Sequence, residues 1–296
     1  MSMITLAELA TRIPDGIKLA VPKDDTGVSV AAIVALVRRG IKNLHLVCLP
    51  TSGLPAELLI GAGCVRTLET SAITLGEYGA APQFGRIAKD GSVKLVDATC
   101  PAVYAGMQAS QKGIPFIPLR GIFNSDLLAN RADWTIIDNP FTADDPIVAI
   151  GAIDPDVALF HAEAGDRFGN VFMGRNRDCL LMAHASKASF CTVETIVEGN
   201  LLDDPARAGA VVPAMYLDGV AHVPQAAWPV GFGDDYPVND QWMKRYVSEA
   251  RDCAGFDAWL DDLIDQAPWA AEVESIAKTD VDKARIDTAA TERQKS

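Results

Sequence analysis

Short apolar runs alternate with helical patterns along most of the chain. In the N-terminal part, three runs have the length and apolar content of buried strands: IKLAVP at 17–22, LHLVCLP at 44–50 and CVRTLETSA at 64–72. The remaining residues of this part carry helical patterns, at 5–13, 28–40 and 54–63. The second of these helices closes with two arginines and a glycine, which commonly end helices. This alternation indicates parallel strands joined by crossover helices.

The centre of the chain repeats this arrangement. Residues 92–99 predict a strand, residues 101–113 a helix with proline in its first turn, and the run IPFIPLRG at 114–121 the next strand of the same scheme. Further along, residues 154–164 and 186–198 predict two strands, with a helix around DCLLMAHAS between them.

The character of the chain changes after about Asp240. The stretch QWMKRYVSEARDCAGFDAWLDDLIDQA has the pattern of an amphipathic helical pair. The final residues, ATERQKS and those just before them, are polar enough to fray. We therefore expect an α/β domain over residues 1–240 and a helical C-terminal extension over residues 241–296.

Composition and charge exclude several classes of protein. A chain of 296 residues with 49% hydrophobic content can bury a large core without disulfides or metal. Its net charge of −13 argues against binding to the phosphates of nucleic acid. The first residues do not resemble a secretion signal, and no window approaches the ~20 apolar residues of a membrane span. We expect a soluble cytoplasmic protein with neither a nucleic-acid nor a membrane partner.

The cysteines and histidines do not predict a metal site. The six cysteines are scattered with no C-x-x-C pair, so we expect reduced thiols that lie mostly in the core; they are Cys48, Cys64, Cys100, Cys179, Cys191 and Cys253. The four histidines, His45, His161, His184 and His222, are far apart in the sequence. His45 lies inside an apolar run and is most simply a strand histidine whose ring nitrogens have hydrogen-bond partners within the fold.

Several familiar nucleotide and hydrolase motifs are absent from the sequence. It contains neither a G-x-x-x-x-G-K-[ST] phosphate loop nor a G-x-S-x-G nucleophile elbow. The segment GAGCVR at 61–66 imitates the start of a dinucleotide fingerprint. However, it follows a predicted helix and precedes a predicted strand, which is the reverse of the required order.

The segment HAEAGDRFGN at 161–170 places polar residues at the end of a predicted strand, where open α/β sheets gather ligand sites. Asp166 can accept backbone N–H groups, and Gly169-Asn170 suits a tight turn. The apolar residues VFM that follow predict a hairpin or a short excursion. A structural turn is the favoured interpretation, and direct participation in catalysis is the alternative.

The order of these segments resembles the family I coenzyme A transferases. The resemblance is carried by HAEAGDRFGN, then ASFCTVETIVE, then VVPAMYLDGVAHVPQAAWP, with support from GMQASQKGIPFIPLRG at 106–121. The sequence is most similar to α subunits of the glutaconate CoA-transferase type and of the related steroid ring-cleaving hydrolases. The likeness extends from the first strand to near Tyr246.

The resemblance implies an open α/β fold with a mostly parallel sheet flanked by helices. It also implies an obligate complex with a homologous β subunit, commonly α2β2, and coenzyme A as a substrate rather than a permanently bound cofactor. In such transferases a glutamate of the β chain attacks the acyl-CoA carbonyl. The α chain helps to shape the acyl pocket.

None of the internal glutamates that we considered has the Glu-x-Gly-like setting of that nucleophile; they are Glu57, Glu69, Glu77, Glu163 and Glu194. Glu194 matches a family strand position and is interpreted as structural. We therefore expect no catalytic residue in this chain.

The sequence departs from the family pattern in three places. The loop VPKDDTGVSV at 21–30 has one glycine where the family has a glycine-rich loop, so Lys23, Asp24 and Asp25 could reach the site instead. The segment QAAWP at 225–229 replaces Gly-Gly-Ala-His-Pro. Residues 98–100, Ala-Thr-Cys, replace a glutamate of the steroid hydrolases. Cys100, at a helix start, could act as a nucleophile, but a buried or helix-capping cysteine is the favoured interpretation.

The candidate site residues fall into two sets. Those expected in the substrate or acyl-CoA pocket are Lys23, Asp24, Thr51, Ser52, Gly53, Ser71, Cys100, Gln108 and Arg120. Of these, Gln108 and Arg120 could contact a substrate carboxylate or CoA. Those expected to position the site without contacting substrate are His161, Glu163, Asp166, Asn170 and Glu194.

The leading hypothesis is the α subunit of a two-subunit CoA-transferase that acts on a small carboxylic acid and its acyl-CoA. A second hypothesis keeps the fold and makes the complex a hydrolase or lyase of a cyclic or β-keto acyl-CoA. A third is a non-catalytic acyl-CoA-binding or regulatory protein on the same scaffold.

Overall fold

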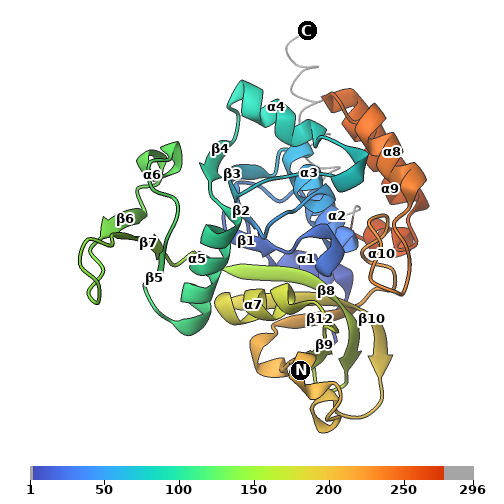
Figure 1. The fold of residues 1–296 in the computed structure, drawn as a ribbon. Helices are drawn as coiled ribbons and strands as arrows, with labels where there is room; N and C mark the ends of the chain where they lie inside the picture. The colour runs from blue at the N-terminus through green and yellow to red at the C-terminus, as the bar shows by residue number, and fades with distance from the viewer. Residues whose placement is uncertain (1–2, 277–296) are drawn as a thin grey trace, which may run out of the picture.

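A central sheet organises the chain in the computed structural model, which describes residues 3–276. The main sheet of this described part has nine strands: β1 Lys18–Val21, β2 Leu44–Cys48, β3 Val65–Thr70, β4 Lys94–Asp97, β8 Val157–Asp166, β9 Val171–Phe172, β10 Ala188–Val197, β11 Val211–Val212 and β12 Gly219–His222. The order β11-β9-β8-β1-β2-β3-β4 forms the path, and β10 pairs with β8 and β12 (Figure 1).

The sheet is mostly parallel, as predicted. The pairs β1–β2, β2–β3, β3–β4, β1–β8, β8–β10 and β10–β12 are parallel. The exceptions are the short strands β9 and β11, which pair antiparallel. The carboxyl ends of the parallel strands therefore lie at one edge of the sheet, where sites of open α/β folds form.

Helices cover both faces of the sheet. On one side lie α1 Leu6–Arg12, α2 Val30–Arg39, α3 Leu54–Gly61, α4 Pro82–Asp90, α8 Asp240–Glu249, α9 Cys253–Gln266 and α10 Ala270–Glu274. On the other lie α5 Cys100–Lys112 and α7 Arg177–Ala185. Successive side chains of a strand point to opposite faces of the sheet, so two hydrophobic core clusters form, one on each face. On β1, Leu19 and Val21 belong to the first cluster and Ala20 to the second.

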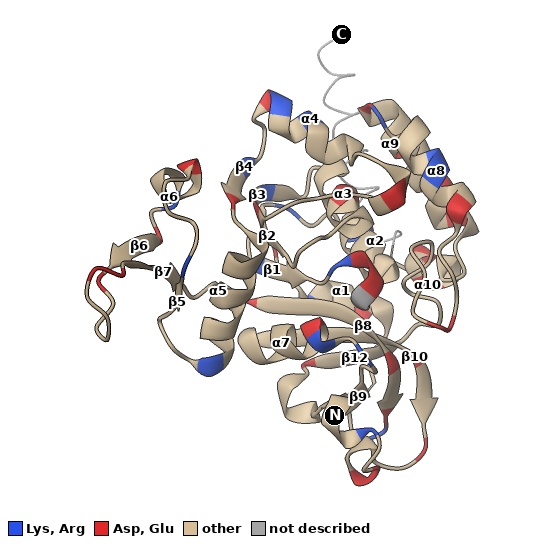
Figure 2. Ribbon diagram, in the orientation of Figure 1, with Lys and Arg blue, Asp and Glu red and all other residues tan. Residues whose placement is uncertain are grey.

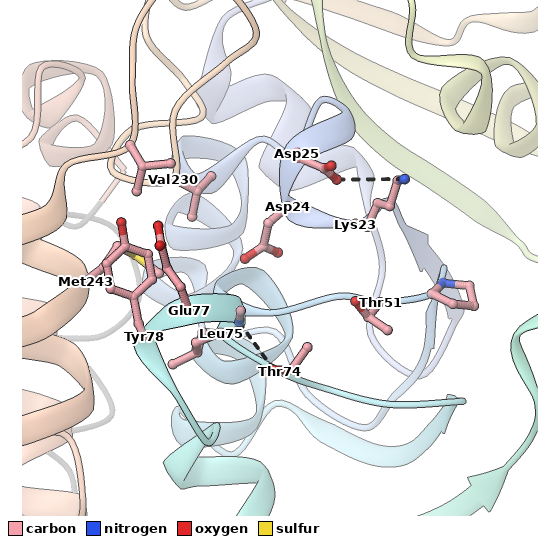
Figure 3. Close-up of a pocket in the computed structure, with 13 residues that line it drawn as sticks. Lys23, Asp24, Asp25, Thr51, Thr74, Leu75, Glu77, Tyr78, Val230 and Met243 are labelled. Atoms are coloured by element: carbon pink, nitrogen blue, oxygen red, sulfur yellow. Dashed lines mark hydrogen bonds and ion pairs between the residues drawn. The ribbon is translucent and has the colours of Figure 1, made fainter.

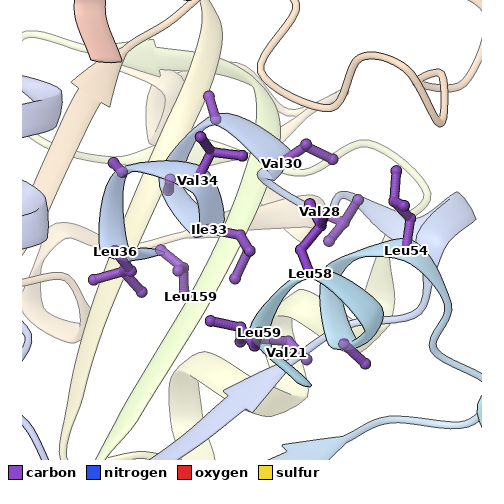
Figure 4. Close-up of a cluster of buried hydrophobic side chains, with 14 of the residues drawn as sticks. Val21, Val28, Val30, Ile33, Val34, Leu36, Leu54, Leu58, Leu59 and Leu159 are labelled. Atoms are coloured by element: carbon purple, nitrogen blue, oxygen red, sulfur yellow. The ribbon is translucent and has the colours of Figure 1, made fainter. Parts of the chain in front are cut away.

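Helix α2 shows how local sequence sets an element. Ser29 caps it by accepting a hydrogen bond from the Ala32 amide, and Gly40 ends it in a left-handed conformation at φ 80°. Every residue from Val30 to Leu36 is buried. Figure 4 shows this apolar helix packed with α3 beside β1 and β8, so the first crossover unit forms the centre of the larger core.

A second, small sheet corrects the sequence interpretation. Strands β5 Phe116–Leu119, β6 Trp134–Ile137 and β7 Ile147–Gly151 form an antiparallel sheet in the order β5-β7-β6. The prediction that residues 114–121 continue the parallel scheme is wrong, because their partner β7 comes from about 30 residues further along the chain. Pro118 has no backbone N–H to donate, which is compatible with an edge strand.

The small sheet projects from the main body beside α5 (Figure 1), and the Arg131 side chain links it to the main sheet. The buried Arg131 guanidinium donates to Glu69 on β3 at 2.8 Å and to the Asp97 carbonyl at 3.1 Å. A short helix, α6 Asp126–Asn130, lies between β5 and β6. Within residues 3–276, the remaining elements are five 3-10 helices: η1 Asp24–Thr26, η2 Gly76–Tyr78, η3 Leu201–Asp203, η4 Ala208–Ala210 and η5 Ala214–Tyr216.

The C-terminal helices belong to the larger core cluster. Trp259 and Phe256 of α9 and Tyr246 of α8 are among the largest fully buried side chains. Phe256 packs directly on Gly61 of α3, where a Cβ atom would lie 2.3 Å from its ring. The helical C-terminal region is thus present as predicted, and the boundary at residue 240 stays a prediction. The predicted frayed end, ATERQKS, lies outside the described residues.

Candidate functional site

A pocket of about 470 Å³ lies at the carboxyl ends of β1, β2 and β3 (Figure 3). Strand ends, the η2 loop and the segment that leads into α8 form it. Its lining residues are Lys23, Asp24, Asp25, Pro50, Thr51, Thr74, Leu75, Gly76, Glu77, Tyr78, Val230, Val238 and Met243. The pocket therefore combines ionisable side chains from the N-terminal half with apolar ones from residues 230–243.

Asp24 is held at the N-terminus of α3. Its two carboxylate oxygens accept hydrogen bonds from the Gly53 amide at 2.9 Å and the Leu54 amide at 3.0 Å. A Cβ atom at Gly53 would lie 2.4 Å from Asp24 Oδ2, so this approach requires glycine. Burial raises the pKa of Asp24 to about 7, although the two amide hydrogen bonds oppose the shift. Asp24 can thus exchange a proton near neutral pH.

Two further contacts complete the polar side of the pocket. Lys23 Nζ lies 3.9 Å from Asp25 Oδ1. The Tyr78 hydroxyl donates a hydrogen bond to Asp240 at the start of α8, and this bond raises the pKa of Tyr78 to about 12. Because Met243 on the same helix lines the pocket, the Tyr78–Asp240 contact joins the η2 loop to the opposite wall.

The structure brings together part of the predicted pocket set. Lys23, Asp24 and Thr51 line the pocket. Ser52 and Gly53 lie directly behind it: the Ser52 hydroxyl is buried and donates to the Pro22 carbonyl at 3.5 Å, and the Gly53 amide holds Asp24.

The other predicted residues of this set lie outside the pocket lining. Ser71 Oγ and Cys100 Sγ, at the end of β3 and the start of α5, are 3.2 Å apart. Gln108 is exposed on α5. Arg120, whose side chain is 68% exposed, pairs with Asp145 at 2.5 Å beside the small sheet. Their proposed substrate contacts stay predictions.

The favoured interpretation of Cys100 as buried or helix-capping is wrong. Cys100 is exposed, and the α5 cap is Thr99, whose side chain accepts a hydrogen bond from the Ala102 amide. Thr99 is the better acceptor, because hydroxyl oxygens accept far better than thiols. Four of the six cysteines are buried, as expected: Cys48, Cys64, Cys179 and Cys191.

Sequence reasoning missed the part of the pocket that comes from Thr74–Tyr78 and from residues 230–243. Glu77 was considered as a nucleophile, yet nothing local placed it near Lys23 and Asp24. Proximity here depends on the crossover from β3 and on the packing of α8, which no short motif encodes. In the altered loop at 21–30, the adjacent acids Asp24 and Asp25 were the local sequence feature that indicated this pocket.

His161 and Glu194 form the centre of a buried polar network beside this site. His161 is fully buried; its Nε2 lies 2.6 Å from Glu194 Oε1, and its Nδ1 lies 2.8 Å from Thr192 Oγ1. Tyr236 donates to Glu194 Oε1 at 2.8 Å, and the Gln225 amide donates to Oε2 at 2.8 Å. Burial raises the pKa of Glu194, but the hydrogen bond and charge of His161 and its other donors outweigh burial and lower it.

This network holds the segment that forms one wall of the pocket. Tyr236 also accepts the Ala227 amide at 3.1 Å, so Glu194 fixes both ends of a loop that includes Val230. The contacts fit the expected positioning role of His161 and Glu194, which stays a prediction.

Asp166 and Asn170 fix the turn between β8 and β9. Asp166 Oδ1 accepts the amides of Phe168 and Asn170, and its Oδ2 accepts the Leu201 amide at 2.9 Å. The predicted hairpin is confirmed by the antiparallel pairing of β8 with β9. Glu163 is half-buried nearby; burial raises the pKa of its carboxyl, and Gly174 leaves space for it, since a Cβ there would clash with its Oε1.

Two other candidate glutamates have structural contacts. Glu57 is fully buried and accepts the Gln83 and Phe84 amides and the Tyr246 hydroxyl; burial raises its pKa despite these bonds. Glu69 contacts His45 Nε2 at 3.1 Å and Arg131, which confirms the interpretation of His45 as a satisfied strand histidine. Of the five glutamates considered, Glu77 alone lines the pocket.

Gly27, the single glycine of the altered loop, makes a close backbone approach to β8. Its carbonyl accepts the His161 amide at 2.6 Å, and a Cβ atom at Gly27, where φ is 95°, would lie 2.3 Å from the His161 carbonyl oxygen. The loop is therefore anchored to the strand that carries the buried network.

Residues 3–276 offer neither a metal cluster nor a membrane-spanning helix. They contain no group of three or more His, Cys, Asp and Glu side chains arranged to hold a metal ion. Within the same range, none of the helices has the length and apolar content needed to cross a membrane.

Comparison with known proteins identifies the fold and the family. The family model described as Coenzyme A transferase matches residues 3–222. The A-type subunit of 3-oxoadipate CoA-transferase from Pseudomonas knackmussii is 30% identical over 276 residues, covering 88% of this chain and 93% of the relative.

Two solved structures are similar over most of the chain. A variant of the decarboxylase AibA/AibB has a TM-score of 0.79 and 29% identity, over 89% of this chain and 98% of that one. Glutaconate coenzyme A-transferase from Acidaminococcus fermentans has a TM-score of 0.84 over 94% of this chain and 93% of that one; at 22% identity, it shows the fold alone.

Proposed function

This chain belongs to the coenzyme A transferase family as a subunit of the A, or α, type, and we propose that it serves a two-subunit enzyme that moves CoA between an acyl-CoA and a small carboxylic acid. The observation that carries the proposal is the pocket at the carboxyl ends of β1–β3, in a chain that matches an α-type subunit over nearly its whole length. Coenzyme A is then a substrate that enters and leaves in each cycle.

We propose that the partner subunit supplies the glutamate nucleophile. Its carboxylate attacks the thioester carbonyl, which forms a mixed anhydride and releases CoA thiolate. The thiolate then attacks the glutamyl carbonyl of the anhydride, so that a glutamyl-CoA thioester forms and the first acid leaves as its carboxylate. The acceptor carboxylate reverses these steps and leaves as the new acyl-CoA. In this chain, the engagement of Glu57, Glu69 and Glu194 by donors supports their assignment to the scaffold.

The role of this chain is then to bind and orient the acyl group. Val230, Val238 and Met243 offer it an apolar wall, and Asp24 and Thr51 offer polar contacts. A network that includes His161 and Glu194 holds the Val230 loop in place, which reduces the ordering cost of substrate binding.

Exposed apolar side chains support a homologous partner subunit. Ile114, Phe116, Ile136 and Phe141 are exposed on or next to the small sheet, and Phe141, in the β6–β7 loop, is 94% exposed. Figure 2 shows the three strands of this sheet without charged residues. Such a surface is typical of an interface. We propose that the partner covers it in an α2β2 enzyme that works in the cytoplasm.

Trapping the covalent intermediate tests the assignment of the nucleophile. The purified complex is incubated with acyl-CoA, reduced with borohydride, and each subunit is weighed by mass spectrometry. We expect the modified glutamate on the partner, in the wild type and equally in the Glu77→Gln variant. A modified glutamate on this chain would show that the assignment is wrong.

A matched pair of variants tests the proposed interface. Ile136→Lys on the small sheet should weaken co-purification with the partner, whereas Leu202→Lys, also exposed but on η3, should not. Equal retention of the partner by both variants would place the interface elsewhere.

A lyase is the second candidate, because the similar structure AibA/AibB is a decarboxylase. An assay without acceptor acid separates the two. Exchange of CoA that strictly requires an acceptor supports transfer, and loss of CO2 or release of free CoA without one supports a lyase or hydrolase.

A further inference from the structure

The charge of the pocket lining is unbalanced. The carboxyl groups of Asp24, Asp25 and Glu77 face a space that Lys23 shares with them. Lys23 already lies within ion-pair distance of Asp25, at 3.9 Å. Among the described lining residues, negative charge therefore exceeds positive charge.

The acid at the centre of the pocket is fixed in place. Two backbone amides, of Gly53 and Leu54, hold the Asp24 carboxyl, and the absence of a Cβ atom at Gly53 gives it room. Figure 3 shows Asp24 between Val230 and Thr51. While Asp24 accepts both of these amides, they are not available to a second carboxylate that enters the pocket.

Apolar side chains also line the pocket, on the side where Figure 3 shows Glu77 and Tyr78. Val230, Val238 and Met243 come from the loop and helix that follow β12, and Leu75 comes from the loop before η2. Figure 3 shows Met243 and Val230 on the side away from Lys23 and Thr51. An alkyl chain can bury its surface there, which favours binding in proportion to the apolar area covered.

We propose that the pocket selects acyl groups that end in an uncharged alkyl group and discriminates against acyl groups that carry a second carboxylate. The proposal rests on the function proposed above, since it takes this pocket as the acyl site. It sets the chain apart from relatives named for 3-oxoadipate and glutaconate, both of which are dicarboxylates. A terminal carboxylate would meet like charge here, and like-charge juxtaposition is a common device for rejecting a substrate.

Two thioesters of equal chain length provide the test. Pentanoyl-CoA and glutaryl-CoA differ in that the terminal methyl of the first is a carboxylate in the second. The complex of this chain with its partner is assayed for CoA exchange with each. We expect kcat/KM for pentanoyl-CoA to exceed that for glutaryl-CoA by at least roughly tenfold at low salt. Equal values, or a preference for glutaryl-CoA, would overturn the proposal.

Variants that remove the exposed charges sharpen the test. Asp25, whose side chain is 80% exposed, and Glu77, also exposed, can be changed without disturbing the core. The double variant Asp25→Asn, Glu77→Gln should narrow the preference by roughly threefold to tenfold, mainly by improving kcat/KM for glutaryl-CoA. The control Asp257→Asn removes an exposed carboxylate from α9, outside the pocket, and should leave the preference unchanged. The same change in both variants would contradict a local charge effect.

Calorimetry separates failure of this proposal from failure of the proposed function. Binding of each thioester to the complex is measured without acceptor acid. Tighter binding of pentanoyl-CoA, even with no exchange, would support the selectivity and remove the transferase assignment. Exchange with a preference for glutaryl-CoA would support the transferase assignment and overturn the proposed selectivity. If neither thioester binds or exchanges, the assignment of the pocket as the acyl site is overturned, and the selectivity with it.

Discussion

Asp24 and Glu194 are both carboxylates withdrawn from water near the same pocket, yet their pKa values shift in opposite directions. Burial raises the pKa of Asp24 to about 7, because two amides do not offset it and Asp25 and Glu57 add negative charge nearby. Burial acts on Glu194 too, but His161, Tyr236 and the Gln225 amide outweigh it and lower the pKa.

The opposite pKa shifts distinguish an acid of the pocket, Asp24, from an acid of the supporting structure, Glu194. Where an acid has a histidine, a phenol and an amide as donors, it is ionised and holds the structure together. Where acids lie close together with few hydrogen-bond donors, a carboxyl pKa can rise to near neutral pH. Binding of a ligand can then change the protonation state of the cluster. Both arrangements stand at the sheet edge formed by the strand carboxyl ends.

Removal of His161 should have the largest effect on stability. His161→Ala deletes a fully buried ring and leaves Glu194 and Thr192 without its contacts. We expect the free energy of unfolding to fall by about 3 kcal/mol. Urea unfolding followed by circular dichroism measures it. A loss below about 1 kcal/mol would mean that the network contributes little, and that the contrast with Asp24 does not matter for stability.

Opposite pH dependences should follow from the two acids. Glu194 has a folded-state pKa below its reference of 4.5, so its contribution to stability is present above that reference and is lost as pH falls through the folded pKa. Asp24 has a pKa raised from 3.8 to about 7, so its ionisation destabilises the fold increasingly as pH rises from about 4 to 7.

Conservative amides test these signs. Relative to the wild type, Glu194→Gln should lose stability as pH rises toward about 4.5, because the contribution of Glu194 develops over that window. Asp24→Asn should gain stability by about 1–2 kcal/mol as pH rises from about 4 to 7. Urea midpoints give the two slopes when they are measured below about pH 4.5 for Glu194→Gln and from about pH 4 to 7 for Asp24→Asn. Slopes of the same sign would contradict the comparison.

A smaller effect is expected for Tyr236, which joins the network to the pocket wall. Tyr236→Phe removes the hydroxyl that donates to Glu194 and accepts the Ala227 amide, so we expect a loss of about 1 kcal/mol. In the assembled enzyme, KM for the acyl-CoA should rise by more than kcat falls, since the Val230 loop loses support. An unchanged KM would show that the network does not support the wall of the pocket.

The smallest effect is expected for Tyr78. Tyr78→Phe breaks the contact with Asp240 at the solvent-facing rim, where one hydrogen bond contributes about 0.5 kcal/mol or less. Thermal unfolding should shift by no more than a few degrees, and KM by less than in Tyr236→Phe. A larger loss of stability in Tyr78→Phe than in Tyr236→Phe would show that the rim contact stabilises the protein more than the buried network does.

The elements that formed where the sequence predicted them are those with strong local signals. The first three strands and the helices between them have continuous apolar runs and clear caps, such as Ser29 and Gly40 for α2. The β8–β9 turn followed from Asp166, Gly169 and Asn170, whose conformations and hydrogen bonds are set within a few residues.

The candidate site was predictable only in part, for a reason visible in its residues. Lys23, Asp24 and Thr51 follow strands directly, so the rule that sites form at strand carboxyl ends placed them. Glu77, Val230 and Met243 come from segments with no such rule. Arg120 follows a strand as well, but that strand belongs to the small antiparallel sheet, so Arg120 lies outside this pocket and its substrate contact stays a prediction.

The sequence alone determined the parallel α/β class, most strand and helix positions, the hairpin turn and the likeness to the family, because these depend on period, caps and turn residues that act over short distances. Only the tertiary structure decided that residues 116–119 pair with β7, that Glu194 meets His161 and Tyr236, and that α8 closes the pocket around Asp24. Those contacts join residues that lie tens to more than two hundred positions apart. Which distant segments pair is set by burial and packing of the whole chain, which no local pattern encodes.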